Sequence, residues 1–551
     1  MFALADINEA LADAIPDREA IVTPSRRLSW RDFQLRTRRL AHLLADAGLG
    51  CHRERDALAP WESGQDHVAL YLYNGPEYLE GMIGAYKART APFNVNYRYV
   101  EDELLYLLRD AATRVVIYHA SFAPLLARVL ATLPPMALLL QVDDGSGEAL
   151  LPGACDYEEA LAGASSAPLP VRPSDDDLYI VYTGGTTGMP KGVLWRQHDI
   201  FFAALGGRVI GGDAVTSVAE LVAAARDGGV RLLPAPPFMH AAAHWTAFMI
   251  LHQGGTVVLP ENVRRLDPDD IWRTIKREGV NSISIVGDAF ARPLIDQLRA
   301  GRYDLSSLRV VGSGGAILSP SLKKALLELL PDIMLFDGFG ASETGAQGAS
   351  LTTAYSTEVA SAFKMDEHTL VLDEGLTRRL APDETGVGWL ARSGHVPLGY
   401  LGDEAKTRRT YPVIEGIRYA VPGDRAEYTS EGTIKVFGRD SVCINTGGEK
   451  VFAEEVEQAL KRHPGVYDVV VTGVPNERWG EQVTAVVALR PGTRPDEDAL
   501  RDTAAEVLAR YKLPKAFVFV DAVVRAPSGK PDYRWAKTTA AAAVAADSMG
   551  R

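Results

Sequence analysis

The sequence predicts an α/β protein with a large N-terminal domain of parallel sheets, a small β-rich subdomain and a small C-terminal α/β lid. Three observations predict this class. Short apolar runs alternate with amphipathic stretches over most of the 551 residues, and that order is typical of parallel sheets joined by helices. The length exceeds what a single domain commonly holds. Near residue 438 the alternation gives way to a different pattern.

Short apolar runs predict the strands of the large domain; they are residues 68–73, 115–119, 178–182, 255–259, 282–286 and 308–311. Amphipathic segments between them predict helices, at 76–87, 100–109, 269–278 and 319–330. The stretch 232–260 contains no Asp, Glu, Lys or Arg, but prolines and a glycine pair interrupt it. About 15 residues remain for a helix, and roughly 20 are needed to cross a bilayer. We therefore expect a buried core helix and no transmembrane segment.

The second half of the chain predicts two smaller units. Residues 389–435 contain turn residues and short alternating runs, which favour a β-rich subdomain. The lid is predicted from helices at 453–462 and 497–510 and strands at 466–473 and 484–489. The alanine-rich segment 536–546 predicts a frayed terminal helix. We place the domain boundary after Gly438, which gives an N-terminal domain of residues 1–438 and a lid of residues 439–551.

Composition excludes several classes of protein. Apolar residues are 47% and charged residues 23% of the chain, as in soluble globular proteins. Lys and Arg number 58 against 71 Asp and Glu, a net charge of −13, which argues against nucleic acid as a partner. Three widely spaced cysteines form neither a disulfide framework nor a zinc pattern. The N-terminus has no secretory signal pattern, so we expect a cytoplasmic protein.

A glycine- and threonine-rich loop follows the predicted strand 178–182. Residues 182–192 are YTGGTTGMPKG, and such a loop can surround phosphate oxygens with N–H and O–H groups. It differs from a Walker A loop because Pro190 precedes Lys191 and no Ser or Thr follows the lysine. An ordinary turn between two elements is the alternative interpretation. The phosphate-binding candidates are Thr183, Gly184, Gly185, Thr186, Thr187, Gly188 and Lys191.

This loop resembles the signature loop of adenylate-forming enzymes. That superfamily contains acyl-CoA synthetases, aryl-CoA ligases, luciferases and the adenylation domains of peptide synthetases. Further motifs that resemble those of the superfamily follow in the same order between residues 314 and 530. The resemblance covers essentially the whole chain, and it implies an N-terminal adenylation domain followed by a mobile lid.

The resemblance implies a nucleotide site in the large domain. The residues that would border adenine and the acyl carbonyl are Gly314, Gly315 and Ala316. The segment 337–345, DGFGASETG, resembles the aromatic-Gly-x-Thr-Glu motif, with Phe339 where tyrosine is commoner and Ser342 in place of threonine. In this motif the ring stacks on adenine, the hydroxyl meets phosphate and Glu343 holds Mg²⁺, an ion that takes oxygen ligands. The other nucleotide candidates in the segment are Asp337, Gly338 and Gly340.

Later motifs imply the remaining nucleotide contacts and the hinge. Residues 419–424, YAVPGD, resemble the element in which Asp424 accepts hydrogen bonds from both ribose hydroxyls. In Gly438-Arg439-Asp440, the resemblance assigns Arg439 to the nucleotide and Asp440 to the hinge.

The lid motifs imply the CoA contacts and a catalytic lysine. Residues 444–457, INTGGEKVFAEEVE, resemble the segment in which Gly447 and Gly448 line the pantetheine tunnel, and Lys450 is a candidate contact for anionic CoA. Residues 525–530, RAPSGK, resemble the ending that carries the adenylation lysine, here Lys530. The implied catalytic residues are therefore Lys530, Glu343 and Ser342.

The implied reaction uses ATP, Mg²⁺ and CoA. A carboxylic acid attacks the α-phosphate of ATP, which gives acyl-AMP and pyrophosphate, and the CoA thiol then displaces AMP. Attacking group and phosphate are both negative, so the site mainly positions them and stabilises charge. In the superfamily the lid rotates between the two steps, so Lys530 faces ATP in one pose and the glycine loop admits CoA in the other.

The acyl pocket is implied by residues 237–245, PFMHAAAHW. His240 matches the superfamily's pocket histidine, and Ala241, His244 and Trp245 accompany it. Zinc on His240 and His244 is disfavoured, because the intervening glutamate and a third ligand are missing. The alanines at 241–243 and the glycines at 206, 207, 211 and 212 leave room for a long or bulky acyl group. Residues 234–245 together with residues 182–200 resemble actinobacterial FadD-type synthetases of cholesterol side-chain acids. A steroid side-chain acid is our first expectation, a medium- or long-chain fatty acid the second and an aryl acid the third.

Other activities share these motifs. A peptide-synthetase adenylation module would require a carrier protein, and about 20 residues follow Lys530. A luciferase-like oxygenase and a non-catalytic nucleotide-binding protein remain alternatives, which light output and carboxylate-dependent pyrophosphate exchange would distinguish. The sequence leaves homodimerisation open, although dimers are common in the superfamily.

Overall fold

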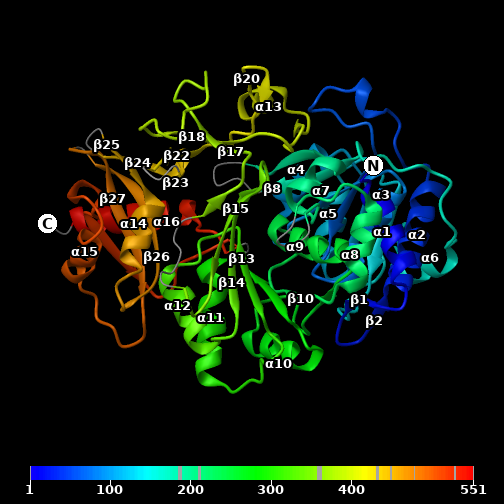
Figure 1. The fold of residues 1–551 in the computed structure, drawn as a ribbon, viewed down its shortest axis with the longest axis horizontal. Helices are drawn as coiled ribbons and strands as arrows, with labels where there is room; N and C mark the ends of the chain where they lie inside the picture. Colours follow the sequence, from blue (N-terminus) through cyan, green and yellow to red (C-terminus); the bar gives the residue numbers. More distant parts are fainter. Residues whose placement is uncertain are drawn as a thin grey trace.

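The fold is taken from a computed structural model that describes residues 2–183, 189–208, 213–356, 363–429, 433–446, 449–476, 478–526 and 529–549. Three lobes lie side by side (Figure 1). The N-terminal lobe and the central lobe together form the large domain, and the C-terminal lobe lies beside the central one. The predicted α/β class and the large-and-small organisation are confirmed.

The N-terminal lobe contains a five-stranded parallel sheet with helices on both faces. Its strand order is β4-β3-β5-β6-β7. The bounds are β3 (His67–Tyr71), β4 (Ala91–Asn94), β5 (Thr113–His119), β6 (Leu138–Val142) and β7 (Cys155–Asp156). Val68 and Leu70 pack in one apolar core, and Ala69 and Tyr71 in another on the opposite face. This alternation explains why the strand is apolar throughout, as expected for a parallel sheet covered on both sides.

The helices of this lobe divide between the two faces. α2 (Trp30–Asp46), α3 (Pro76–Lys87) and α6 (Tyr157–Gly163) contribute to the first core, and α4 (Glu101–Asp110) and α5 (Ala123–Leu130) to the second. The predicted helices at 76–87 and 100–109 are thus confirmed, with a one-residue shift in the second.

The central lobe contains a nine-stranded sheet in the order β16-β15-β14-β13-β12-β10-β11-β1-β2. Its bounds are β1 (Glu19–Val22), β2 (Arg27–Ser29), β10 (Arg231–Pro234), β11 (Thr256–Val258), β12 (Ser282–Ile285), β13 (Val310–Gly314), β14 (Met334–Ala341), β15 (Gly345–Thr352) and β16 (Lys364–Met365). The six strands from β14 to β1 are parallel, whereas β15, β16 and β2 add antiparallel edges. The carboxyl ends of β12, β13 and β14 therefore lie at one edge of the sheet.

Helices cover both faces of this sheet. One face is covered by α10 (Pro268–Glu278), α11 (Gly287–Ala300) and α12 (Pro320–Leu329), and the other by α1 (Leu4–Ala14), α8 (Val218–Asp227) and α9 (Ala241–His252). α9 is the buried core helix predicted within 232–260. No helix of the described residues is long and apolar enough to cross a membrane.

Smaller sheets connect the lobes. One antiparallel sheet contains β8 (Leu178–Thr183), β9 (Lys191–Arg196) and β19 (Gly399–Tyr400). The helix α7 (Gln197–Ala204) comes directly after β9 in the chain. The β-rich subdomain contains β17 (Thr369–Leu372), β18 (Gly388–Arg392), β22 (Asp424–Tyr428) and β23 (Ile434–Arg439), the hairpin of β20 (Val413–Ile414) and β21 (Ile417–Arg418), and α13 (Glu404–Thr410). The prediction of β structure at 389–435 is confirmed, although β19 leaves this unit to pair with β9.

The lid has its own sheet and cores. The sheet contains β24 (Cys443–Thr446), β25 (Glu449–Phe452), β26 (Val466–Asn476), β27 (Gly480–Leu489) and β28 (Ala516–Val520). α14 (Ala453–Leu460) and α15 (Glu497–Ala505) pack on one face, and α16 (Tyr533–Met549) packs on the other. β26 and β27 pair in antiparallel fashion. The predicted parallel sheets are therefore those of the large domain.

Two predictions for the lid need correction. The helix expected at 497–510 ends at Ala505, because the chain turns there and buries Leu508 in the lid core. The alanine-rich tail is not frayed at its start, since Ala536 and Ala540 are fully buried against Val470 and Val486.

Candidate active site

The candidate site lies at the carboxyl edge of the nine-stranded sheet, where ligands bind in open α/β sheets. Gly314 and Gly338 are neighbours across β13 and β14. Gly315 adopts a left-handed conformation with φ +84°, and a side chain there would point toward Ala242 and Val286. The segments after β12 and β13 therefore lie beside the start of α9. Glycine at 315 permits both the backbone angle and the open space.

The turn between β14 and β15 carries Ser342 and Glu343. The buried indole of Trp195 donates a hydrogen bond from Nε1 to the Ser342 carbonyl oxygen, at 3.0 Å. The hydroxyl of Tyr400, in β19, donates to Oε1 of Glu343 at 3.1 Å. Beneath the turn, a side chain at Gly345 would collide with Ala203 of α7. The three-stranded sheet and α7 thus fix the position of the Glu343 carboxylate.

Lys530 lies at this site in the described lid pose. Its side chain is solvent-accessible but closely surrounded by protein groups, and this desolvation lowers its pKa. The positive charge of Arg439 lowers that pKa further, whereas Glu343 and Asp424 oppose the shift. Four predicted residues from distant parts of the chain therefore lie near one another.

The ribose candidate and the second cation of this group form an ion pair. Asp424, at the start of β22, lies 3.3 Å from Arg439, at the end of β23. Burial raises the pKa of Asp424, and the charges of Arg439 and Lys530 counteract that rise. Glu454, in the first turn of α14, also contributes negative potential at Lys530. The site therefore brings charges of both signs together.

A clamp within the lid orients the Lys530 loop. Arg525 donates to both carboxylate oxygens of Asp468, each at 2.7 Å, and to the Gly529 carbonyl at 3.1 Å. The Ala526 amide donates to the Lys530 carbonyl at 2.9 Å. Bidentate pairing of this kind fixes geometry as well as charge, so Arg525 ties Gly529, the residue before Lys530, to Asp468 of β26.

The phosphate-loop candidates are only partly described. Gly184, Gly185, Thr186, Thr187 and Gly188 lie outside the described residues, as do Gly447 and Gly448 of the lid. Thr183 and Lys191 are opposite each other where β8 and β9 begin their hairpin. Nζ of Lys191 lies 3.5 Å from Oδ2 of Asp403.

Two candidates of the 337–345 segment have protein partners. Asp337 is buried and pairs with Lys323 at 2.8 Å, with burial raising its pKa. Phe339 lies 5.4 Å from the ring of Phe363. Gly340 lies close to the Gly345 backbone across the strand pair, so this position excludes a side chain.

The pocket histidines differ in environment. His240 precedes the first residue of α9, and burial together with the charge of nearby Lys530 lowers its pKa to about 3. His244 is buried and donates from Nδ1 to the Phe238 carbonyl at 2.7 Å, and burial lowers its pKa to about 4. Both rings are therefore neutral near pH 7, beside Ala241 and Trp245. The bond to Phe238 uses only Nδ1 of His244, and Nε2 of both rings has no hydrogen-bond partner among the described residues.

The hinge and CoA candidates interact with each other in this pose. Asp440 opens a 3-10 turn, Asp440–Val442, directly after β23. Its Oδ1 lies 3.4 Å from Nζ of Lys450 and 3.6 Å from Nε of Arg425. Lys450 thus lies beside Asp440 in the described arrangement.

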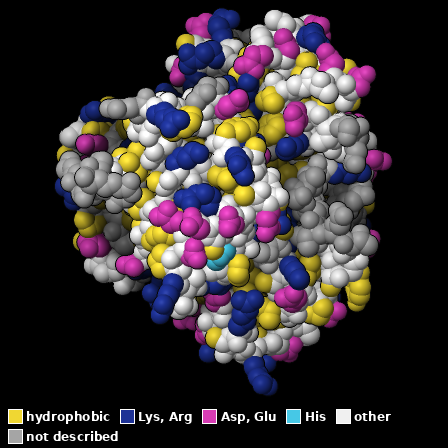
Figure 2. All heavy atoms as spheres, turned by 90° about the vertical axis from the view of Figure 1, so that its left-hand side faces the viewer, with side chains coloured by type: hydrophobic (Ala, Val, Ile, Leu, Met, Phe, Trp, Pro, Cys, Tyr) yellow, Lys and Arg dark blue, Asp and Glu magenta, His cyan; other side chains and the backbone are white. Residues whose placement is uncertain are grey.

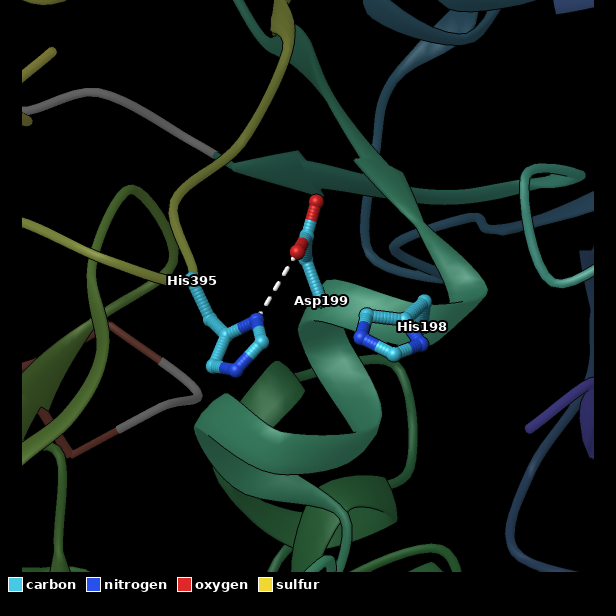
Figure 3. Close-up of side chains that lie close together, drawn as sticks. All are labelled: His198, Asp199 and His395. Atoms are coloured by element: carbon cyan, nitrogen blue, oxygen red, sulfur yellow. Dashed lines mark hydrogen bonds and ion pairs between the residues drawn. The ribbon is translucent and has the colours of Figure 1, made fainter. Parts of the chain in front are cut away.

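A separate cluster joins α7 to the loop after β18. His198, Asp199 and His395 each offer a ligand atom within 4.8 Å of the others, and Figure 3 shows His395 and Asp199 pointing toward one another. Nδ1 of His395 lies 2.9 Å from Asp199, whose other oxygen accepts from Arg196 at 2.7 Å. Because a guanidinium already neutralises this carboxylate, we interpret the cluster as a structural bridge that supports α7.

Sequence reasoning missed several residues of the site. Tyr400, Trp195 and Glu454 contact or influence predicted residues, yet none stands in a pattern that indicates this role. Tyr400 and Glu343 are 57 positions apart, and Trp195 and Ser342 are 147 apart.

The surface carries charges of both signs, because acidic and basic side chains are interspersed on the face in Figure 2.

Comparisons with known proteins identify the family of the chain. The family model for AMP-binding enzymes matches residues 9–401, and the model for their C-terminal domain matches residues 455–530. Medium-chain acyl-CoA ligase Mig of Mycobacterium avium is 52% identical over 541 residues, 98% of each chain. The 3-oxocholest-4-en-26-oate–CoA ligase of Rhodococcus rhodochrous is 41% identical, covering 97% of this chain and 95% of its own.

The chain is also similar to the medium/long-chain-fatty-acid–CoA/3-oxocholest-4-en-26-oate–CoA ligase of Mycobacterium tuberculosis. It is 41% identical over 540 residues, covering 97% of this chain and 95% of its own. Among solved structures, the anthranilate CoA ligase AuaEII with anthranoyl-AMP superposes with a TM-score of 0.81 at 22% identity, covering 99% of this chain and 98% of its own. That likeness supports the fold. The chain therefore belongs to the AMP-binding enzyme family and is an acyl-CoA ligase of the adenylate-forming superfamily.

Proposed function

We propose that this protein activates a bulky or long-chain carboxylic acid in two steps, first to acyl-AMP and then to the CoA thioester, with release of pyrophosphate and AMP. The observation that carries the proposal is the convergence of Lys530 from the lid with Asp424 and Glu343 from the large domain and with Arg439 at the boundary between them. Such a group supplies both positive potential for phosphates and acceptors for ribose hydroxyls.

In the first step, the protein would bring two negative groups together. Lys530 and Arg439 would neutralise phosphate charge as pyrophosphate leaves, and the Ser342 hydroxyl would donate to a phosphate oxygen. Asp424 would accept from the ribose, and Phe339 would stack on adenine. Preorganised donors of this kind act without reorganisation at the moment of reaction.

Glu343 fits a Mg²⁺ site. Its carboxylate is buried, and Tyr400 occupies one position on one oxygen, so acceptor capacity remains on both oxygens. Magnesium prefers oxygen ligands and is usually held by one or two carboxylates with substrate phosphates. Bound there, Mg²⁺ would supply charge neutralisation at the phosphates.

For the second step, the proposal assigns the hinge to Asp440 and the CoA contacts to Lys450, Gly447 and Gly448. A hinge must absorb a change in backbone angles, and Asp440 follows Gly438, whose φ is +109°. The ion pair of Lys450 with Asp440 would open as the lid rotates, which would free the ammonium for the anionic coenzyme.

For the acyl group, a steroid side-chain acid and a medium- or long-chain fatty acid have equal support from the relatives' names. The pocket wall of neutral His240 and His244 with Ala241 and Trp245 suits an apolar acyl chain, because it carries no cation near pH 7. An aryl acid ranks third.

The three cysteines are unpaired, and we infer a cytoplasmic enzyme from this.

The test is pyrophosphate release measured over a panel of acids, with and without CoA. We expect release that depends on carboxylate and Mg²⁺, with C8 to C18 fatty acids or a 3-oxo steroid side-chain acid as the best substrates. CoA thioester should form in proportion to AMP. ATP binding without carboxylate-dependent pyrophosphate release would contradict the proposal.

A further inference from the structure

A buried ion pair joins the lid to the large domain. Nζ of Lys461, directly after α14, lies 3.0 Å from Oδ2 of Asp288, in the first turn of α11. Their side chains are only 7% and 3% exposed. An unpaired buried charge is strongly unfavourable, so Lys461 stays buried here because it is paired with Asp288. The pair therefore ties this lid pose to one place on the large domain.

The large domain holds Asp288 ready for this contact. Oδ1 of Asp288 accepts from the Ser319 amide at 2.7 Å, and the Asp288 amide donates to the Ile317 carbonyl at 3.0 Å. A carboxylate in the first turn also benefits from the positive end of the helix. The loop before α12 thus fixes one oxygen and directs the other toward the lid.

A second contact lies one helical turn further along α11. The guanidinium carbon of Arg292 lies 4.9 Å from the centre of the Tyr467 ring, in β26 of the lid. Arg292 also approaches Asp288, at 3.5 Å. Asp288 and Arg292 are four residues apart on α11 and therefore lie on the same face of the helix. Because they contact two separate segments of the lid, the lid cannot rotate about one contact without breaking the other.

These contacts are next to the catalytic loop. Gly529, with φ +76°, directly precedes Lys530, and a side chain at 529 would come within 3.2 Å of Val286 and 3.3 Å of Ala289. Both residues flank Asp288 on the chain. The surface of α11 that receives Lys461 thus also receives the loop that carries Lys530.

We propose that Asp288 and Lys461 form a latch that holds the lid in the pose in which Lys530 faces the nucleotide. This rests on the proposed function. The two residues are positioning residues for acyl-AMP formation: they contact neither substrate nor reacting atoms. When the lid rotates for the CoA step, the pair separates and both groups return to water.

The test separates the two half-reactions in Lys461→Met, Asp288→Asn and the double variant. For Lys461→Met, we expect carboxylate-dependent ATP–pyrophosphate exchange to fall at least about tenfold, since one partner of a buried pair is lost. Thioester formation from preformed acyl-AMP and CoA should stay within about twofold of wild type. Lys461→Arg should restore most of the exchange.

Lys512→Met is the matched control. Lys512 is also a lid lysine in an ion pair, but its partner Glu455 lies within the lid, at 2.6 Å. This variant should leave both half-reactions near wild type. In the double variant Asp288→Asn/Lys461→Met, exchange should be no lower than in the worse single variant, because both changes remove the same contact.

Hydrogen–deuterium exchange gives a readout independent of activity. Peptides over residues 286–292 and 461–467 should exchange faster in Lys461→Met than in wild type or Lys512→Met. Equal losses in both half-reactions, additive effects in the double variant, or unchanged protection of these peptides would overturn the latch. If the wild-type protein showed no carboxylate-dependent ATP–pyrophosphate exchange, the proposed function would be contradicted instead. Hydrogen–deuterium exchange would then still test the latch.

Discussion

The two sides of the candidate active site are built on different physical principles. On the side predicted to bind the nucleotide, charged side chains converge from the turn after β14, the paired strands β22 and β23, and the end of the lid, and each belongs to a short motif. On the acyl side, neutral histidines and small residues come from one segment, 237–245, and their environment is set by packing. Short motifs therefore encode charge at fixed positions, whereas the size of the acyl pocket depends on the surrounding core.

The largest expected effect concerns the nucleotide side. Lys530→Ala should reduce acyl-AMP formation by about 10² to 10³ or more, as loss of one preorganised donor commonly does. CoA transfer from preformed acyl-AMP should remain close to wild type. Stopped-flow or exchange assays of each half-reaction measure this difference.

Lys537→Ala is the control for that variant, since Lys537 is a largely exposed lid lysine paired with Glu481 at 3.4 Å. It should leave both steps unchanged. Equal losses in the two half-reactions of Lys530→Ala would refute the role of Lys530.

A smaller loss is expected when the support of Glu343 is removed. Tyr400→Phe deletes the hydroxyl that donates to the carboxylate, and a hydrogen bond to a charged group contributes about 1.5 to 3 kcal/mol. Adenylation should fall by about 10- to 100-fold, and a Mg²⁺ titration should show a higher requirement for the ion.

Tyr411→Phe is the matched control. Its ring lies 5.8 Å from that of Tyr400, and its hydroxyl has no hydrogen-bond partner among the described residues. If both variants behave alike, the bond between Tyr400 and Glu343 has no part in the reaction.

On the acyl side, the expected effect depends on the substrate. Ala241→Phe adds bulk to the first turn of α9, so kcat/KM for a steroid or C16 acid should fall about tenfold, within the range for shape changes in apolar pockets. The KM for ATP and the activity toward hexanoate should not change. A uniform loss with all acids would place Ala241 outside the acyl pocket.

The smallest effect is a shift in pH dependence. Desolvation and Arg439 lower the pKa of Lys530 below 10.5. Lys530 is positive below that pKa, so acyl-AMP formation should decline as pH rises through it, earlier than for a free lysine. In Lys530→Arg, whose guanidinium stays charged, the residual rate should show its alkaline decline at higher pH. Identical alkaline limbs in the two proteins would assign the titration to another group.

Sequence reasoning located the fold and the motif residues because both depend on local patterns. Apolar runs predicted β3, β5 and β12, and the spacing of known motifs indicated Glu343, Asp424 and Lys530. The domain boundary after Gly438 and the roles of these residues remain predictions.

Contacts between distant residues could not be predicted in this way. Asp288 and Lys461 are 173 positions apart, and neither belongs to a motif. The partner of Glu343 is likewise a tyrosine from another sheet. Such pairs follow from the packing of whole elements, and a single sequence carries no local signal for them.

A crystal structure with a non-hydrolysable ATP analogue and Mg²⁺ would show whether the lid and the large domain form one nucleotide site. We expect the Lys530 ammonium within hydrogen-bonding distance of a phosphate oxygen, Asp424 on the ribose and the metal on Glu343. A nucleotide bound with Lys530 far from the phosphates, in a lid pose that keeps Lys461 on Asp288, would contradict a shared nucleotide site.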